Sequence, residues 1–303
     1  MFTFHALPES TRALLRAGGL DPDAVAAIVR MAVTEDLAGG IDVTSTATVP
    51  AGQRSVGEFA ARSAGVLAGL PVAMAVVEAV CGEAASDIEF CRRDGDRIAK
   101  GDVVARVTAP TRSFLTAERS ALNLLCHLSG VATLTRRWAD ALEGTPAKVR
   151  DTRKTMPGLR ALQKYAVRCG GGVNHRMALS DAALVKDNHV VAAGGVAQAF
   201  AKVRALDGQM PIEIEVDSVE AMREAIEAGA DLILLDNFTV EQLREAVGVR
   251  SECGRPVILE ASGGLTIESA RAVGATGVDY IAVGELTHSA RVLDLGLDLT
   301  SVI

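Results

Sequence analysis

Aromatic residues are scarce in this chain and make up only 3% of its 303 residues. Proteins that bind single-stranded nucleic acid stack the bases on exposed aromatic rings, so this scarcity argues against such a role. The formal net charge of −7 argues in the same direction, because nucleic acid and anionic membrane surfaces attract basic proteins. We therefore expect neither nucleic acid nor a membrane as a partner.

Long hydrophobic segments and cysteines are scarce as well. The longest apolar run, Val66 to Val77, contains Gly69 and Pro71 and is too short to cross a bilayer. The N-terminal segment lacks the apolar core of a signal peptide. The cysteines form no Cys-x-x-Cys pair and no Cys/His cluster of zinc-ligand spacing, which is typical of reduced thiols in a cytoplasmic protein. They are Cys81, Cys91, Cys126, Cys169 and Cys253.

The composition is that of a globular enzyme, with 49% hydrophobic and 23% charged residues. A chain of this length is expected to form one large and one small domain, or two domains. Helical and β-like segments are mixed before residue 116, which predicts an α+β unit. The predicted divisions are an N-terminal arm (1–20), a small α+β domain (21–115), an α/β barrel with its leading helix (116–290) and a tail that returns to the small domain (291–303).

The barrel is predicted from an alternation that begins at Lys148. Short apolar segments alternate there with amphipathic segments, and from Ile212 onward they recur every 20–25 residues or so, the spacing of βα units. A doubly wound sheet is the alternative, but no Gly-x-Gly-x-x-Gly follows the first strand of any unit. The expected strands are 148–152, 183–187, 211–217, 231–236, 256–262 and 280–284.

The segment from Lys148 to His189 is strongly basic. It contains nine Lys or Arg residues and three Asp residues, a local balance of +6, so the rest of the chain carries −13. A basic pocket in an acidic protein suits a small, highly anionic ligand. Some of these cations, Arg160, Lys164 and Arg168, are spaced as on the solvated face of a helix. Others, Arg153-Lys154 and Asn174-His175-Arg176, stand beside turn residues, where functional side chains concentrate.

Polar residues and glycines end the predicted barrel strands. Because barrel active sites gather at the carboxyl ends of the strands, these residues are candidates for one site. An acid at such an end can also be a helix cap, which is an equally good interpretation of Asp236 alone. The strand-end candidates are Arg153, Lys154, Lys186, Glu215, Asp236, Ser262, Gly263, Gly264 and Gly284.

Two of these strand ends have the pattern of a phosphate-binding loop. In the segment EASGGLT, Ser-Gly-Gly is followed by Thr266, which opens a helix, and AVGELTHS repeats a similar arrangement one unit later. Glycines let the backbone approach an anion, and the free N–H groups at a helix start favour phosphate. His288 could contact the same phosphate or lie on a surface helix.

Carboxylates complete the predicted pocket. Glu215 and Asp236 suit Mg²⁺, which prefers carboxylates, waters and substrate phosphates, and they also suit ribose hydroxyls. The sequence has no evident Ser-His-Asp or Cys-His nucleophile arrangement. These residues favour a transfer reaction on a phosphorylated sugar, in which positioning and electrostatics supply the catalysis.

The chain resembles the quinolinate phosphoribosyltransferase family. The resemblance rests on RDTRKTMPGLRALQKYAVRCGGGVNHRMALSDAALVKDNH, EVDS, LILLDNF, EASGG and AVGELTHS, and it runs from EDLAGGIDVTS to the end of the chain. It implies a glycosyltransferase that converts quinolinate and phosphoribosyl pyrophosphate (PRPP) into nicotinate mononucleotide, pyrophosphate and CO₂, with Mg²⁺, in NAD biosynthesis. It further implies a small domain joined to an open α/β barrel, in a homodimer that shares its active sites.

The resemblance also assigns residues to ligands. Glu215 and Asp236 would face ribose or the metal, and with Lys154 they would be catalytic. Arg119 would reach into the barrel of the partner subunit. The 5′-phosphate would meet Ser262, Gly263, Gly264, Gly284 and His288. The quinolinate carboxylates and PRPP anions would meet Arg119, Thr152, Arg153, Lys154, His175, Arg176 and Lys186.

Three other interpretations stay open at this point. A paralogue on the same scaffold, such as the homologue found with molybdate transport, would use another substrate. A barrel isomerase or aldolase would use Lys186 as a base or as a Schiff-base amine. A metabolite sensor would bind the same anions without turning them over.

Overall fold

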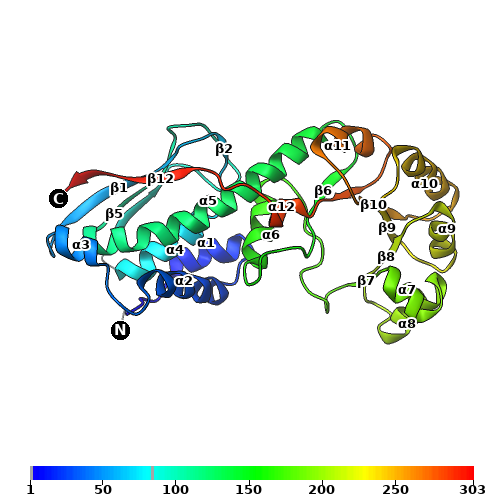
Figure 1. Cartoon of the computed structure of the whole chain (residues 1–303), viewed down its shortest axis with the longest axis horizontal. Helices are drawn as coiled ribbons and strands as arrows, with labels where there is room; N and C mark the ends of the chain where they lie inside the picture. The colour runs from blue at the N-terminus through cyan, green and yellow to red at the C-terminus, as the bar shows by residue number, and fades with distance from the viewer. Residues whose placement is uncertain (1–2, 83–84) are drawn as a thin grey trace. The chain divides into compact units, whose positions relative to one another are not determined.

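The computed structural model describes residues 3–82 and 85–303. The chain divides into two compact units, and most of their elements are labelled in Figure 1. The first unit comprises the described residues up to Leu134 together with Met156–Gly171 and Ser289–Ile303. The second comprises Thr135–Thr155 and Gly172–His288. The long helix α5 (Thr111–Ala141) therefore contributes residues to both units.

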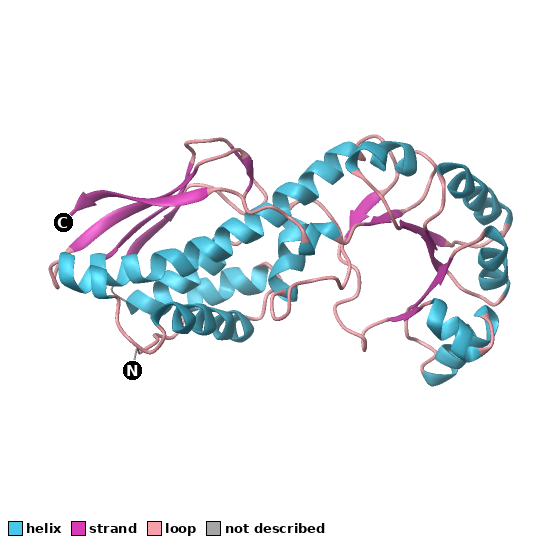
Figure 2. Cartoon of the chain, in the orientation of Figure 1, coloured by secondary structure: helices cyan, strands magenta, loops and turns pink. Residues whose placement is uncertain are grey.

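The first unit is built on an antiparallel sheet with helices along one face (Figure 2). Its strand order is β12 (Leu295–Val302), β1 (Arg54–Ala61), β5 (Val103–Pro110), β3 (Ser86–Phe90), and β2 (Gly65–Val66) pairs separately with β4 (Arg97–Ile98). The helices besides α5 are α1 (Glu9–Ala17), α2 (Pro22–Leu37), α3 (Val43–Thr48), α4 (Leu70–Cys81) and α6 (Arg160–Cys169).

Helix α4 forms the centre of this unit because almost its whole length is apolar, and all of its residues except Pro71 are buried. Its buried N-terminus would leave unpaired N–H groups, and the Asp94 carboxylate accepts hydrogen bonds from two of them, those of Gly69 (2.7 Å) and Leu70 (3.1 Å). Helix α5 packs on the sheet, where the Phe114 ring lies 6.2 Å from that of Phe59.

Both ends of the chain join this unit. Helix α1 lies where the sequence showed no strong periodicity and predicted an arm, and it buries Leu15 in the core. At nine residues it is too short for a long apolar stripe. At the other end, β12 pairs antiparallel to β1 over the segment that was expected to return to the small domain.

The second unit contains a parallel sheet of six strands in the order β6-β11-β10-β9-β8-β7. The sheet curves, and helices cover its convex side (Figure 2). Because β6 and β7 form the two edges, the barrel is open. The predicted α/β fold with an open barrel and a smaller N-terminal domain is therefore confirmed. The strands are β6 (Lys148–Arg150), β7 (Ala183–Val185), β8 (Ile212–Val216), β9 (Leu232–Asp236), β10 (Ile258–Ser262) and β11 (Tyr280–Ala282).

The barrel helices begin where the sequence provides caps. The side chains of Ser218, Thr239 and Thr266 each accept a hydrogen bond from a backbone N–H in the first turn of the following helix. These caps fix the loops that follow β8, β9 and β10, the loops that carry the predicted site residues. The helices are α7 (Asp187–Ala193), α8 (Val196–Leu206), α9 (Val219–Glu227), α10 (Val240–Glu252), α11 (Ile267–Gly274) and α12 (Glu285–His288).

One sequence interpretation is wrong. Lys164 does not lie on a solvated helix face, because its side chain is fully buried, while Arg168 on the same helix is exposed. Among the helices of the described ranges, none combines the length and the apolar character that crossing a membrane requires.

Candidate active site

A cavity of about 450 Å³ lies at the carboxyl ends of the barrel strands. Parallel strands present their C-terminal residues at one end of the barrel, so side chains far apart in the sequence meet there. We call it the strand-end cavity. Nine of the predicted site residues line it, namely Thr152, Arg153, Lys154, His175, Arg176, Lys186, Glu215, Asp236 and Ser262. Leu184, Leu234, Glu260 and Ala282 complete its walls.

Arginine and lysine side chains make this cavity cationic. Arg176 donates a hydrogen bond from Nη1 to the carbonyl oxygen of Ala182 (2.6 Å), while burial and the charge of Arg153 lower its pKa. Lys154 is held through its backbone: its N–H donates to Thr152 Oγ1 (3.0 Å) and its carbonyl oxygen accepts from Thr287 Oγ1 (2.8 Å). Like charges brought together in this way are suited to an anionic ligand.

Two carboxylates stand among these cations. Glu215, near the end of β8, accepts a hydrogen bond at Oε2 from Lys186 Nζ (2.7 Å). Asp236, at the end of β9, accepts one at Oδ2 from Asn237 Nδ2 (2.8 Å). Both carboxylates also line a neighbouring cavity of about 310 Å³. Carboxylate oxygens are therefore available at the strand-end cavity for hydroxyl groups or a hard cation.

The glycines after β10 are required by the backbone. Gly263 (φ 89°) and Gly264 (φ 60°) are in the left-handed region, which disfavours other residues. A Cβ atom on Gly263 would also lie 2.2 Å from Asn237 Oδ1. On Gly284, a Cβ atom would lie 3.0 Å from Lys154 Cδ and 3.2 Å from His288 Nε2. The bare backbone at both positions suits the close approach of an anion.

The remaining predicted residues lie outside the walls of this cavity. Gly263 and Gly264 follow its lining residue Ser262, while Gly284 and His288 lie beside Lys154. Arg119 is an exposed residue of α5 in the first unit and is not a lining residue. The contact of each of these residues with a particular ligand group stays a prediction.

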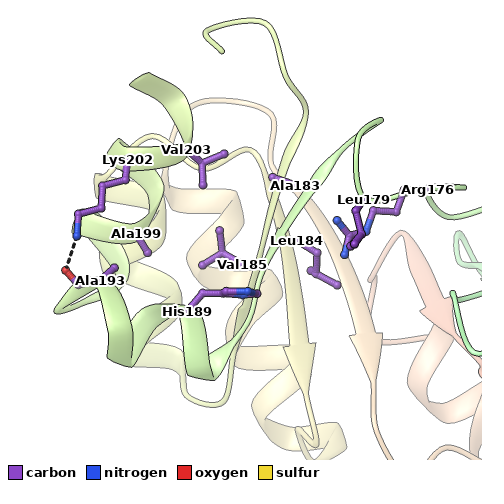
Figure 3. A pocket seen from close by; sticks show the side chains of 10 residues that line it. All are labelled: Arg176, Leu179, Ala183, Leu184, Val185, His189, Ala193, Ala199, Lys202 and Val203. Atoms are coloured by element: carbon purple, nitrogen blue, oxygen red, sulfur yellow. Dashed lines mark hydrogen bonds between the residues drawn. The ribbon is translucent and has the colours of Figure 1, made fainter. Parts of the chain in front are cut away.

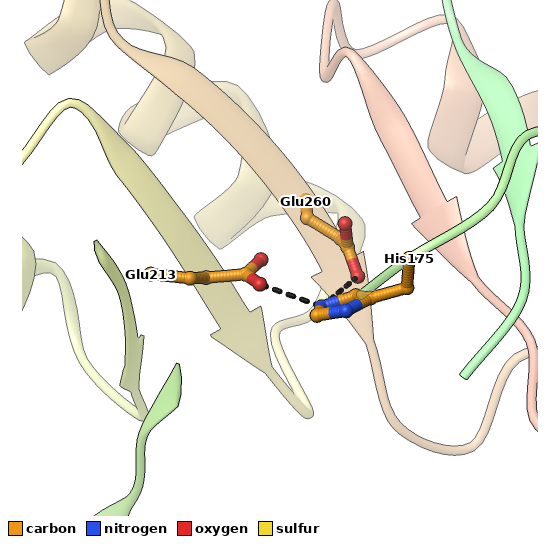
Figure 4. Close-up of side chains that lie close together, drawn as sticks. All are labelled: His175, Glu213 and Glu260. Carbon is orange, nitrogen blue, oxygen red and sulfur yellow. Dashed lines mark hydrogen bonds and ion pairs between the residues drawn. The ribbon is translucent and has the colours of Figure 1, made fainter. Parts of the chain in front are cut away.

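Two buried glutamates near this cavity were not among the residues predicted from the sequence. Glu213 Oε2 lies 2.6 Å from His175 Nε2, and Glu260 Oε1 lies 4.0 Å from the same nitrogen (Figure 4). Arg150 Nη1 pairs with Glu260 Oε2 at 2.5 Å. Burial, together with the charge of Glu213, raises the pKa of Glu260, and the charge of Arg150 opposes this. We call His175, Glu213 and Glu260 the buried cluster.

The strand period contained a signal for these glutamates. Side chains two residues apart on a strand face the same side, so Glu213 shares a side with Glu215, and Glu260 with Ser262. On the barrel strands, the predicted site residues were only the last polar residue or glycine of each strand and the residues next to it. An acid two residues before that last polar residue faces the same side of the sheet. Glu213 and Glu260 therefore form a second polar layer, deeper in the barrel.

A second cavity, of about 320 Å³, lies between β7 and the helices α7 and α8 (Figure 3). Its walls are mostly aliphatic, and its Lys202 donates from Nζ to the carbonyl oxygen of Ala193 (3.2 Å). It lacks the clustered charges of the strand-end cavity, which makes the latter the candidate active site.

Comparisons with known proteins agree with this geometry. The family model described as "Quinolinate phosphoribosyl transferase, C-terminal domain" matches residues 131–298, and the model of the N-terminal domain of the same family matches residues 42–129. The structure is similar to the crystal structure of NadC from Streptococcus pyogenes, with a TM-score of 0.88 and 38% identity, covering 94% of this chain and 98% of that one.

Sequence relatives extend over nearly the whole chain. The nicotinate-nucleotide pyrophosphorylase (carboxylating) of Mycobacterium leprae (strain TN) is 52% identical over 277 residues, 91% of this chain and 98% of that protein. The probable nicotinate-nucleotide pyrophosphorylase (carboxylating) of Bacillus subtilis (strain 168) is 41% identical over 267 residues, 88% of this chain and 90% of that protein. Two matching domain models and relatives of this extent show that the chain belongs to the quinolinate phosphoribosyltransferase family.

Proposed function

We propose that this protein transfers the phosphoribosyl group of PRPP to quinolinate and releases CO₂, giving nicotinate mononucleotide and pyrophosphate in NAD biosynthesis. The observation that carries the proposal is the strand-end cavity, which is lined by four cationic side chains and by three acidic ones, those of Glu215, Asp236 and Glu260. Relatives over nearly the whole chain are named nicotinate-nucleotide pyrophosphorylase (carboxylating).

The cations of the cavity can neutralise the negative charge of the two substrates. Quinolinate brings two carboxylates and PRPP brings several phosphate charges, which repel one another unless cations neutralise them. Arg153 and Arg176 are suited to carboxylates because a guanidinium group binds them through two parallel hydrogen bonds. Lys154, placed beside Gly284, is suited to the charge that develops on the departing pyrophosphate.

The carboxylates of Glu215 and Asp236 are suited to the positive charge that develops during the reaction. As the bond to pyrophosphate breaks, positive charge develops on the ribose, and nearby carboxylates stabilise it. The attacking pyridine nitrogen becomes positively charged once it is ribosylated. That charge stabilises the carbanion left when CO₂ departs, so the ring itself assists decarboxylation.

We include Mg²⁺ in the proposal, and the donor set fits it. Mg²⁺ binds through one or two carboxylates together with substrate phosphates and water, and the cavity offers the carboxylates of Glu215 and Asp236. When bound, the ion would neutralise phosphate charge on PRPP.

Dimerisation and location also belong to the proposal. We assign Arg119 to the active site of a partner subunit, because it is an exposed cation that does not line the strand-end cavity of its own chain. A reducing, cytoplasmic location is supported by the five cysteines, all of which are free.

The test is to incubate the protein with quinolinate, PRPP and Mg²⁺ and to assay CO₂ and nicotinate mononucleotide. Both products should appear together. If neither product forms and nicotinate is accepted instead, the proposal is wrong. Borohydride trapping of a substrate on Lys186 would favour an aldolase-like enzyme, and tight binding without turnover would favour a sensor.

A further inference from the structure

We propose that Glu213 is a positioning residue for this reaction: through His175 it fixes the loop that presents Arg176 to the substrate carboxylates. The inference rests on the proposed function, because the loop matters only if Arg176 binds an anion. Glu213 lines a cavity of about 280 Å³ beside His175 and Arg176, not the strand-end cavity, so its effect would pass through the histidine.

The hydrogen bonds of His175 fix its protonation. The backbone N–H of Arg176 donates to His175 Nδ1 (2.7 Å), so Nδ1 is an acceptor and carries no proton. The neutral ring therefore carries its proton on Nε2, which points at Glu213 Oε2, 2.6 Å away. Both ring nitrogens are thus engaged by protein groups, although the residue lines the strand-end cavity.

The same bonds distinguish a proton from a metal ion. His175, Glu213 and Glu260 offer ligand atoms within 4.8 Å of one another, as a metal site would. A metal on Nε2 would displace the proton from that nitrogen. Because Nδ1 accepts a hydrogen bond from the backbone N–H of Arg176 and carries no proton either, the ring would then have to be doubly deprotonated. The geometry instead favours a proton held between Nε2 and Glu213.

The loop from Asn174 to Arg176 is held on its other side as well. The Asp151 carboxylate, which is fully buried, accepts from the backbone N–H of His175 (2.8 Å) and from Asn174 Nδ2 (2.5 Å). Arg150 donates from Nε to the carbonyl oxygen of Asn174 (3.4 Å) and pairs with Glu260. The loop is therefore fixed through His175 on one side and through Asp151 on the other.

Removing the acceptor at position 213 should release one side of this loop. The Nε2 proton of a buried ring would lose its partner, which is costly, and the ring would turn to find another. Its Nδ1 would then leave the N–H of Arg176, and the guanidinium group would lose its fixed direction. Small displacements of a binding group weaken binding strongly, so quinolinate should be affected more than PRPP.

The first measurement compares Glu213→Leu with Glu213→Gln. Leucine removes the acceptor, whereas glutamine keeps the shape and offers a carbonyl oxygen to Nε2–H. We expect the KM for quinolinate to rise about tenfold in the leucine variant, as for the loss of one charge-assisted hydrogen bond, and kcat to change much less. The glutamine variant should recover most of the loss. The control is Glu220→Gln, at an exposed glutamate of α9, and its kcat and KM should equal those of the wild type.

The second measurement needs no variant at position 213. Nitrogen-15 NMR of the histidine-labelled, ligand-free protein, with His175 assigned through His175→Gln, should show Nε2 protonated and Nδ1 unprotonated. A proton on Nδ1, a doubly protonated ring or a metal retained on His175 would overturn the inference. So would an unchanged KM in a folded Glu213→Leu variant, or an equal loss in the glutamine variant. A wild-type protein that makes no nicotinate mononucleotide would instead refute the proposed function.

Discussion

Gly263 shows how a single residue constrains the site. Its φ of 89° and the nearby Asn237 side chain leave no room for a Cβ atom. We expect Gly263→Ala to lower the free energy of unfolding by about 1–3 kcal/mol through backbone strain and to weaken PRPP binding. Urea denaturation and calorimetric titration with PRPP measure the two effects. Gly208→Ala is the control, because a Cβ atom there meets open space. Equal behaviour of the two variants would contradict the prediction.

Glu260 should make the stability of the protein depend on pH. Burial raises its pKa from 4.5 to about 8, so between these values the folded protein keeps a proton that the unfolded chain has lost. Because the folded state binds more protons there, its stability falls as pH rises through this range. Glu260→Gln resembles the protonated form at every pH, so the fall should be smaller in this variant. Urea denaturation at several pH values measures this, and parallel curves for the two proteins would contradict it.

At the scale of elements, the carboxyl ends of β8 and β9 should control turnover. We expect Asp236→Ala to lower kcat about a hundredfold while the KM for quinolinate changes little, because the carboxylate acts on charge that develops in the transition state. Glu215→Ala should behave similarly. Asp231→Ala, an exposed residue before the start of β9, is the matched control at the opposite end of the same strand. A loss of quinolinate affinity with unchanged kcat would place Asp236 elsewhere in the mechanism.

The elements of the barrel could be predicted because each strand of the second unit is a short segment with apolar residues, followed within two residues by a polar residue or glycine. The helical spacing of Arg160, Lys164 and Arg168 was equally regular, but spacing tells which residues share a face and not whether that face is buried. Lys164 is buried by the packing around α6, and the residues near it in the sequence do not indicate this burial. The two glutamates of the buried cluster were missed for a related reason, since an acid inside a strand ordinarily indicates a solvent-facing side.

At the scale of the whole molecule, the proposed dimer makes a prediction about Arg119. Arg119→Ala and Asp236→Ala should each be nearly inactive alone. After reversible dissociation and mixing, a mixed dimer would carry one site with both lesions and one site with neither. Random pairing makes about half of the dimers mixed, so roughly a quarter of wild-type activity should return, given the two-fold symmetry.

The control for this experiment is a mixture of Glu215→Ala with Asp236→Ala. Both carboxylates line the same strand-end cavity of one chain, so every mixed dimer keeps one lesion in each site and no activity should return. If Arg119 served its own barrel, its mixture with Asp236→Ala would behave as this control does. With subunit exchange confirmed by mass spectrometry, recovery in the first mixture alone means that Arg119 acts across the interface. If no activity returns in either mixture, each chain holds a complete site.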